Sequence, residues 1–163
     1  MAHPAHDDVV VDTNVLSLSD NEKDPRQGDC LEFLTWLTSD ADWHWVLDDN
    51  GKMAPAIDTS LLWAEYNDTL SPMGTGMLLF QQMLGAERVC FATRPDQDLR
   101  DRIRTLIPRN GRDRVIFGAA CNSATRWLVT CDDDDFPADV RDDARRDFGV
   151  EVSDPSFRRA QPS

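Results

Sequence analysis

The chain has 163 residues, 40% of them hydrophobic, and a formal net charge of −13, so it is long enough for one domain with a well-covered core. Its four cysteines form no CxxC pair and have no close histidine partner, which argues against a zinc site or disulfide framework and favours a reducing cytosol. No apolar run approaches a membrane span, and residues 1–8 lack the segments of a signal peptide. We therefore expect a cytoplasmic protein with no membrane partner.

An acidic chain is a poor general binder of nucleic acid, but the charge of this one is unevenly distributed. Residues 1–93 hold 16 acidic and 4 basic side chains, whereas residues 94–163 hold 14 acidic and 13 basic ones. Seven arginines fall close together, namely Arg94, Arg100, Arg102, Arg104, Arg109, Arg112 and Arg114. They form either a solvated helix face or a rim that contacts phosphate, because the planar guanidinium matches phosphate oxygens.

The first expected strand covers residues 8–12. Its three consecutive valines suit a strand that is buried on both faces, because they are β-branched. Asp12 ends the run, and Thr13 and Asn14 follow, which favour turns and helix starts. In an open α/β sheet, a carboxylate at this position lies where such folds place their ligands. The alternative is that Asp12 only caps the next helix.

Further strands are expected at residues 44–48, 88–92, 127–131 and 149–152, separated by segments with helical patterns. One helix is expected to start at Pro25 and another at Asp113, after a turn at 108–111. Four further helices are expected over 57–70, 77–84, 96–107 and 137–147, the first of them capped by Thr59 or Ser60. The alternation predicts an α/β fold with a mostly parallel sheet covered on both faces. A single domain should span residues 1–155, followed by a polar tail at 156–163. His44 is interpreted as a satisfied structural histidine, and His3 and His6 are given no metal role.

Acidic residues follow two of these strands and head one helix. Asp12, Asp132 and Asp113 can therefore converge on the edge where strand ends and helix starts meet. Glu65 is the expected fourth member, because a carboxylate inside an apolar helix is costly unless it is paired or bound to metal. Such oxygen ligands select Mg²⁺ or Mn²⁺. No side-chain nucleophile accompanies them, so the expected chemistry is metal-assisted hydrolysis of a phosphodiester by bound water.

Four segments occur in an order that matches a known family: VVDTNVL at 10–16, TSLLWAEY at 59–66, DRVIFGAA at 113–120 and LVTCDDDDF at 128–136. This set, within residues 8–152, resembles the ordered motifs of PIN-domain ribonucleases. The resemblance implies a three-layer α/β/α sandwich with a mostly parallel central sheet, dependence on Mg²⁺ or Mn²⁺, and cleavage of RNA.

The resemblance also implies roles for individual residues. The acidic, metal-binding and catalytic centre would consist of Asp12, Glu65, Asp113 and Asp132, with Asn14 and Thr130 as supporting polar groups. Asp58 or Asp68 could replace Glu65, and Asp135 could serve beside or in place of Asp132 as a metal ligand. Independently of the resemblance, if the arginines of residues 94–114 form a phosphate-contacting rim, RNA is expected to contact Arg102, Arg104 and Arg112. An antitoxin protein is an implied partner, and the chain could form a homodimer.

Two other functions stay open. A PIN-like binding or regulatory subunit without strong catalysis is favoured by the surplus acidity, since RNA affinity rests on neutralising phosphates. A phosphotransfer protein of receiver or haloacid-dehalogenase type also groups aspartates at strand ends. However, Asn14 stands where the dehalogenase motif needs its second aspartate, and no lysine follows the later strands as a receiver would require.

Overall fold

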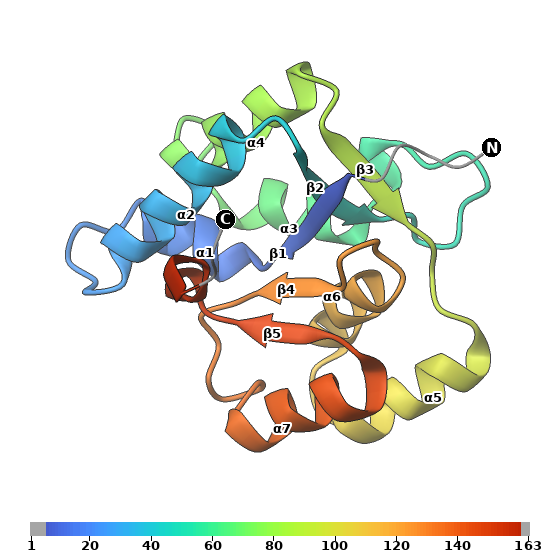
Figure 1. Cartoon of the computed structure of the whole chain (residues 1–163). Coiled ribbons are helices and arrows are strands. Elements are labelled where there is room, and N and C mark those ends of the chain that lie inside the picture. The colour runs from blue at the N-terminus through green and yellow to red at the C-terminus, as the bar shows by residue number, and fades with distance from the viewer. Residues whose placement is uncertain (1–5, 161–163) are drawn as a thin grey trace.

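A computed structural model describes residues 6–160, and a five-stranded sheet crosses its centre (Figure 1). The strands are β1 (Asp7–Val11), β2 (Trp43–Asp48), β3 (Val89–Ala92), β4 (Trp127–Val129) and β5 (Glu151–Ser153). They lie in the order β3-β2-β1-β4-β5, and every pairing is parallel. The five predicted strands and the parallel α/β sheet are therefore confirmed, with strand bounds shifted by one or two residues.

Helices cover both faces of the sheet. They are α1 (Thr13–Ser19), α2 (Gln27–Ser39), α3 (Leu61–Thr69), α4 (Thr75–Gly85), α5 (Gln97–Leu106), α6 (Gly111–Cys121) and α7 (Ala138–Asp143). Helix α6 packs on strands β1 to β4 with α5 beside it, while α1, α2 and α4 pack on one another across the sheet (Figure 1). The described chain is thus a three-layer α/β/α sandwich.

The central strand β1 explains why the core forms as predicted. Its valines at 9–11 are fully buried, since both faces of the strand are covered by helices. On α2, Phe33, Leu34 and Leu37 are buried, because residues three and four apart lie on the same side of a helix. A packed core of this kind holds the strand ends, and the side chains that follow them, in fixed positions.

Several helices begin at residues other than those predicted. The predicted helix over 57–70 is a 3₁₀ turn at Ile57–Thr59 followed by α3, which Ser60 caps, and α4 begins at Thr75 instead of 77. The starts of α2 and α6 have identifiable local causes. Helix α2 starts at Gln27 because the Asp24 side chain accepts the backbone N–H of Arg26 (2.8 Å) and holds Pro25 in a turn outside the helix. Helix α6 starts at Gly111, since the Asn110 side chain accepts the N–H groups of Arg112 (3.0 Å) and Asp113 (3.4 Å). Asp113 therefore lies in the first turn of α6 and does not head it.

Ordered structure continues past the predicted domain boundary at residue 155. Pro155–Ala160 forms a 3₁₀ helix that contacts α2, and Phe157 packs against the core. Residues 161–163 of the predicted tail, like His3, lie outside the described residues. Of the helices between residues 6 and 160, none combines the length and apolar character needed to cross a membrane.

Candidate functional site

The strand order reverses at the centre of the sheet. The chain moves outward from β1 to β2 and β3, and then returns to place β4 on the other side of β1. In open α/β sheets, ligands bind beyond the carboxyl ends of the strands at such a switch point. Asp12 directly follows β1, and Asp132 lies three residues after β4 ends. Both line one open cleft of about 680 Å³, together with Asp113 and Glu65. We call this the acidic cleft.

Asp12 is held by a polar network. Its side chain is 7% exposed, and its Oδ2 accepts hydrogen bonds from Thr130 Oγ1 (2.7 Å) and Asn14 Nδ2 (3.1 Å). Asn14 Oδ1 in turn accepts the backbone N–H of Cys131 (3.0 Å). Asp12 stands at the N-terminus of α1, but its side chain makes no capping hydrogen bond there. The alternative that Asp12 only caps the helix is therefore not supported, and Asn14 and Thr130 occupy the predicted supporting positions.

A turn in the four-aspartate run positions the carboxylates of Asp132 and Asp135 next to Asp113. Thr130 Oγ1, which donates to Asp12, also accepts the backbone N–H of Asp132 (3.0 Å). Asp132 Oδ1 accepts the N–H groups of Asp134 (2.9 Å) and Asp135 (3.0 Å). This turn directs the Asp135 carboxylate toward α6, where it accepts a hydrogen bond from Asn110 Nδ2 (3.0 Å).

The tightest part of the site is a group of three carboxylates. Asp113, Asp132 and Asp135 each offer an oxygen, and these atoms lie within 4.8 Å of one another. Asp113 is only 6% exposed, and its Oδ2 is buried without a hydrogen-bond partner in the described part of the chain. An unpartnered buried oxygen is costly, and a set of oxygen donors suits Mg²⁺ or Mn²⁺. The residues present therefore fit a divalent cation, with Asp135 beside Asp132.

The pKa values of the cluster reflect burial and mutual repulsion. Burial raises the pKa of Asp12 to about 6, opposed by the Thr130 hydrogen bond and assisted by the charge of Glu65. Burial likewise raises the pKa of Asp113 to about 8, and the adjacent Asp135 and Asp12 add to the effect. The metal-free site thus retains the Asp113 proton at neutral pH, whereas Asp12 is mostly ionised there. A cation would displace the Asp113 proton, because metal-ligating carboxylates are ionised.

Glu65 lies at the cleft but differs from the buried carboxylate that the sequence predicts. The buried stripe of α3 runs through Leu62 and Tyr66, so Glu65 is half-buried on the wall of the cleft. It is outside the three-carboxylate group, although its charge raises the pKa of Asp12. The alternatives Asp58 and Asp68 are exposed, and neither lines this cleft. Among the three, the structure brings Glu65 to the site.

The three arginines expected to contact RNA lie in different places. Arg112 lines the acidic cleft, whereas Arg104 lines a separate pocket between α5 and α6. Arg102 donates to the carbonyl of Asp147 (2.7 Å), and its guanidinium lies 4.7 Å from the centre of the Phe148 ring. Arg102 lines neither the cleft nor the pocket. The structure does not bring these three side chains together.

Two buried groups that the sequence analysis missed support the site. Asp48, at the end of β2, accepts hydrogen bonds from Ser60 Oγ (2.7 Å) and from the N–H groups of Leu61 (3.1 Å) and Leu62 (2.9 Å). It thereby fixes the start of α3, the helix that carries Glu65. Tyr66 donates its hydroxyl to the Val11 carbonyl, next to Asp12, and accepts from Trp45 Nε1 (3.2 Å). The sequence signal that could have identified Asp48 is the same as for Asp12, an acidic residue at the end of a predicted strand.

The histidines at the opposite end of the sheet differ from expectation. His44 was expected to be satisfied, but its Nδ1 is buried and lacks a hydrogen-bond partner among the described residues. Its ring lies 4.0 Å from that of His6. One potential metal-ligand atom from each of His6, Asp8 and Cys90 lies within 4.8 Å of the other two. However, both oxygens of Asp8 already accept hydrogen bonds, from the backbone N–H groups of Ala124 and Thr125, which follow α6.

The acidic cleft offers oxygen ligands and little else for covalent chemistry. Cys131 lines it, but the contact with Cys30 and burial raise the pKa of its thiol, so it is a poor nucleophile. Lys23 and Lys52, the two lysines in the sequence, do not line it.

No protein-family model matches the chain, and neither does any curated protein.

Proposed function

We propose that this protein is a Mg²⁺- or Mn²⁺-dependent endoribonuclease of the PIN-like type. The observation that carries the proposal is the buried, unpartnered Oδ2 of Asp113 beside the oxygens of Asp132 and Asp135. These three residues would hold the ion, with Asp12 next to them. When bound, the ion would activate a water molecule and neutralise the charge that develops on the phosphate.

The other residues of the cleft have complementary roles in this proposal. Thr130 and Asn14 donate to Asp12 Oδ2 and favour its ionised form. Arg112, exposed at the rim, can contact a substrate phosphate through its guanidinium group. Glu65, half-exposed on the wall, can accept a proton from water in the cleft. The openness of the cleft to solvent suits a polymer substrate.

RNA is proposed as the substrate because the four ordered motifs resemble those of PIN-domain ribonucleases and supply the residues of this cleft. A phosphotransfer function is less well supported, since neither lysine lines the site. The resemblance also suggests a toxin with an antitoxin partner. A small neighbouring gene whose product inhibits RNA cleavage would establish that narrower function.

A cleavage assay with matched variants tests the proposal. Single-stranded RNA with a fluorescent end label is incubated with Mn²⁺ and either wild-type protein, Asp113→Asn or Asp139→Asn, and the products are separated on a gel. Asp139 is exposed on α7, so its replacement gives the same charge change away from the cleft. We expect Asp113→Asn to lower the rate at least about 100-fold, as for the loss of other groups that stabilise transition-state charge. The control should keep the wild-type rate.

Two outcomes would count against the proposal. Cleavage by Asp113→Asn at the wild-type rate would remove the acidic group from the chemistry. Mn²⁺ binding by a wild-type protein that cuts no RNA would instead favour the PIN-like binding or regulatory subunit.

A further inference from the structure

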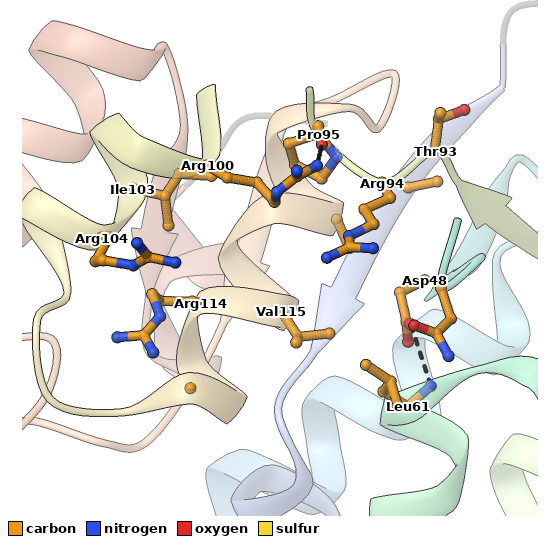
Figure 2. Close-up of a pocket in the computed structure, with 14 residues that line it drawn as sticks. Asp48, Leu61, Thr93, Arg94, Pro95, Arg100, Ile103, Arg104, Arg114 and Val115 are labelled. Atoms are coloured by element: carbon orange, nitrogen blue, oxygen red, sulfur yellow. Dashed lines mark hydrogen bonds between the residues drawn. The ribbon is translucent and has the colours of Figure 1, made fainter. Parts of the chain in front are cut away.

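A second, more enclosed pocket lies beside the acidic cleft, between the ends of β2 and β3 and helices α5 and α6 (Figure 2). Its volume is about 230 Å³. Four arginines from three segments line it: Arg94 follows β3, Arg100 and Arg104 lie on α5, and Arg114 lies on α6. We call this the arginine pocket.

The charge of the arginine pocket is opposite to that of the chain. Its lining contains one carboxylate, that of Asp48, and both Asp48 oxygens are occupied by Ser60 and the first N–H groups of α3. Arg104 contacts Asp101 at 3.9 Å, but both side chains are exposed, so this pair neutralises little. A chain with a net charge of −13 therefore carries a positive site here.

Several guanidinium donors of the pocket are available to a ligand. The backbone N–H of Arg94 donates to Asp49 Oδ1 (2.9 Å), but its guanidinium group makes no hydrogen bond or ion pair within the described residues. Figure 2 shows this side chain entering the pocket opposite Arg104 and Arg114. Arg114 uses only Nη1 to donate to the carbonyls of Ile107 (3.0 Å) and Pro108 (3.2 Å). Planar N–H donors on opposite walls match the oxygens of a phosphate group.

The remaining walls suit a ring. Leu61, Ile103 and Val115 supply apolar surface next to the arginines. The pocket volume lies below the ~300–1,000 Å³ typical of ligand sites, so the pocket can take no more than one nucleotide. Bases of single-stranded RNA stack on guanidinium planes, and aliphatic side chains around such a base keep water away from it. A phosphate with one base, a single nucleotide, satisfies both kinds of wall.

The pocket is connected to the acidic cleft. A groove between α3 and the start of α6 shares Leu61, Gly111 and Val115 with the arginine pocket. At its other end it shares Glu65 and Arg112 with the acidic cleft. A single strand along this groove can place one nucleotide in the pocket and a different phosphodiester at the carboxylates.

We propose that the arginine pocket binds the phosphate and base of one RNA nucleotide away from the scissile bond, and so fixes where along the strand the cut falls. The identity of the polymer as RNA rests on the proposed function. Binding of a single nucleotide in the pocket does not require cleavage, so the two ideas can be tested separately.

The test titrates AMP into the full chain by calorimetry, with EDTA present so that no metal in the acidic cleft binds the phosphate. Adenosine and inorganic phosphate are titrated separately to divide base from phosphate recognition. Arg94→Gln and Arg104→Gln remove one pocket charge each. Arg146→Gln is the control, because Arg146 pairs with Asp143 and Asp147 and does not line the pocket.

We expect AMP to bind the wild type more tightly than phosphate or adenosine. Each pocket variant should bind AMP about 10- to 100-fold more weakly, the range for a lost hydrogen bond to a charged group, and Arg146→Gln should bind normally. With RNA, the pocket variants should raise KM at nearly constant kcat. Unchanged thermal unfolding will show that the variants fold.

Absence of AMP binding at millimolar concentration, or equal binding by the pocket variants, would overturn the inference. If RNA is cut but AMP does not bind, the inference fails and the nuclease function stands. If AMP binds through the arginines and no RNA is cut, the pocket stands as a nucleotide site and the nuclease function fails.

Discussion

Replacement of Asp113 by asparagine should stabilise the metal-free protein, although it removes a group of the proposed active site. Burial raises the pKa of Asp113 to about 8, against 3.8 for an unperturbed side chain. Between these values the folded protein holds a proton that the unfolded chain releases. The free energy of unfolding contributed by this group therefore falls as pH rises from about 4 to about 8.

The size of the effect follows from the shift. At about 1.36 kcal/mol per pKa unit, the carboxyl group costs up to about 4 kcal/mol at pH 7 and about 2 kcal/mol at pH 5. Asparagine does not ionise, but it still buries a polar amide, so we expect it to recover about 2–4 kcal/mol at pH 7. For a domain of this size, each kcal/mol shifts the midpoint by roughly 2–4 °C.

The assay is thermal unfolding of wild type, Asp113→Asn and the exposed control Asp139→Asn between pH 5 and pH 8 in EDTA. The midpoint of Asp113→Asn should exceed that of wild type by an amount that grows with pH, while Asp139→Asn follows wild type. Saturating Mn²⁺ should raise the wild-type midpoint by mass action and leave Asp113→Asn nearly unchanged. An Asp113→Asn midpoint at or below wild type at pH 7 would refute the reasoning.

Three further changes test the residues around the cluster. Thr130→Val should raise the pKa of Asp12 above about 6, because a hydrogen-bond donor to the carboxylate is lost, and an NMR titration with no upward shift would contradict this. Glu65→Gln should slow RNA cleavage at least about tenfold, whereas the exposed control Asp139→Asn should not; equal rates in a gel assay would remove Glu65 from the site. Tyr66→Phe leaves the Val11 carbonyl and the Trp45 N–H without their partner. It should lower the free energy of unfolding by about 1–3 kcal/mol, and an unchanged urea midpoint would show that these groups find other partners.

The parts of the structure that the sequence predicted depend on local patterns. The valines before Asp12 and the run Trp127–Val129 before Thr130 identify buried strands, because β-branched and aromatic residues favour them. Once both strands are placed in a parallel sheet, the acids that follow them must lie at the same edge. The structure brings Asp12, Asp113 and Asp132 to one cleft for this reason.

The parts that the sequence could not predict depend on tertiary contacts. Asp135 enters the cluster through a turn closed by Asp132 and a hydrogen bond from Asn110, which is 25 residues away along the chain. The exposure of Glu65 depends on which side of α3 faces the core, and its apolar neighbours leave that choice open. The arginine pocket forms only where the end of β3 meets α5 and α6, although its arginines stand close in sequence.

The central claim is that the clustered carboxylates of Asp113, Asp132 and Asp135 act on RNA through a divalent cation. Its most direct test is the initial rate of cleavage of a labelled single-stranded RNA by the wild-type chain as Mn²⁺ is titrated from an EDTA-treated start. The account predicts no cleavage without metal and a saturable rise, with half-saturation at the Mn²⁺ concentration that half-saturates the shift in thermal midpoint. Cleavage that persists in EDTA, or no cleavage at Mn²⁺ concentrations that fully stabilise the fold, would contradict it.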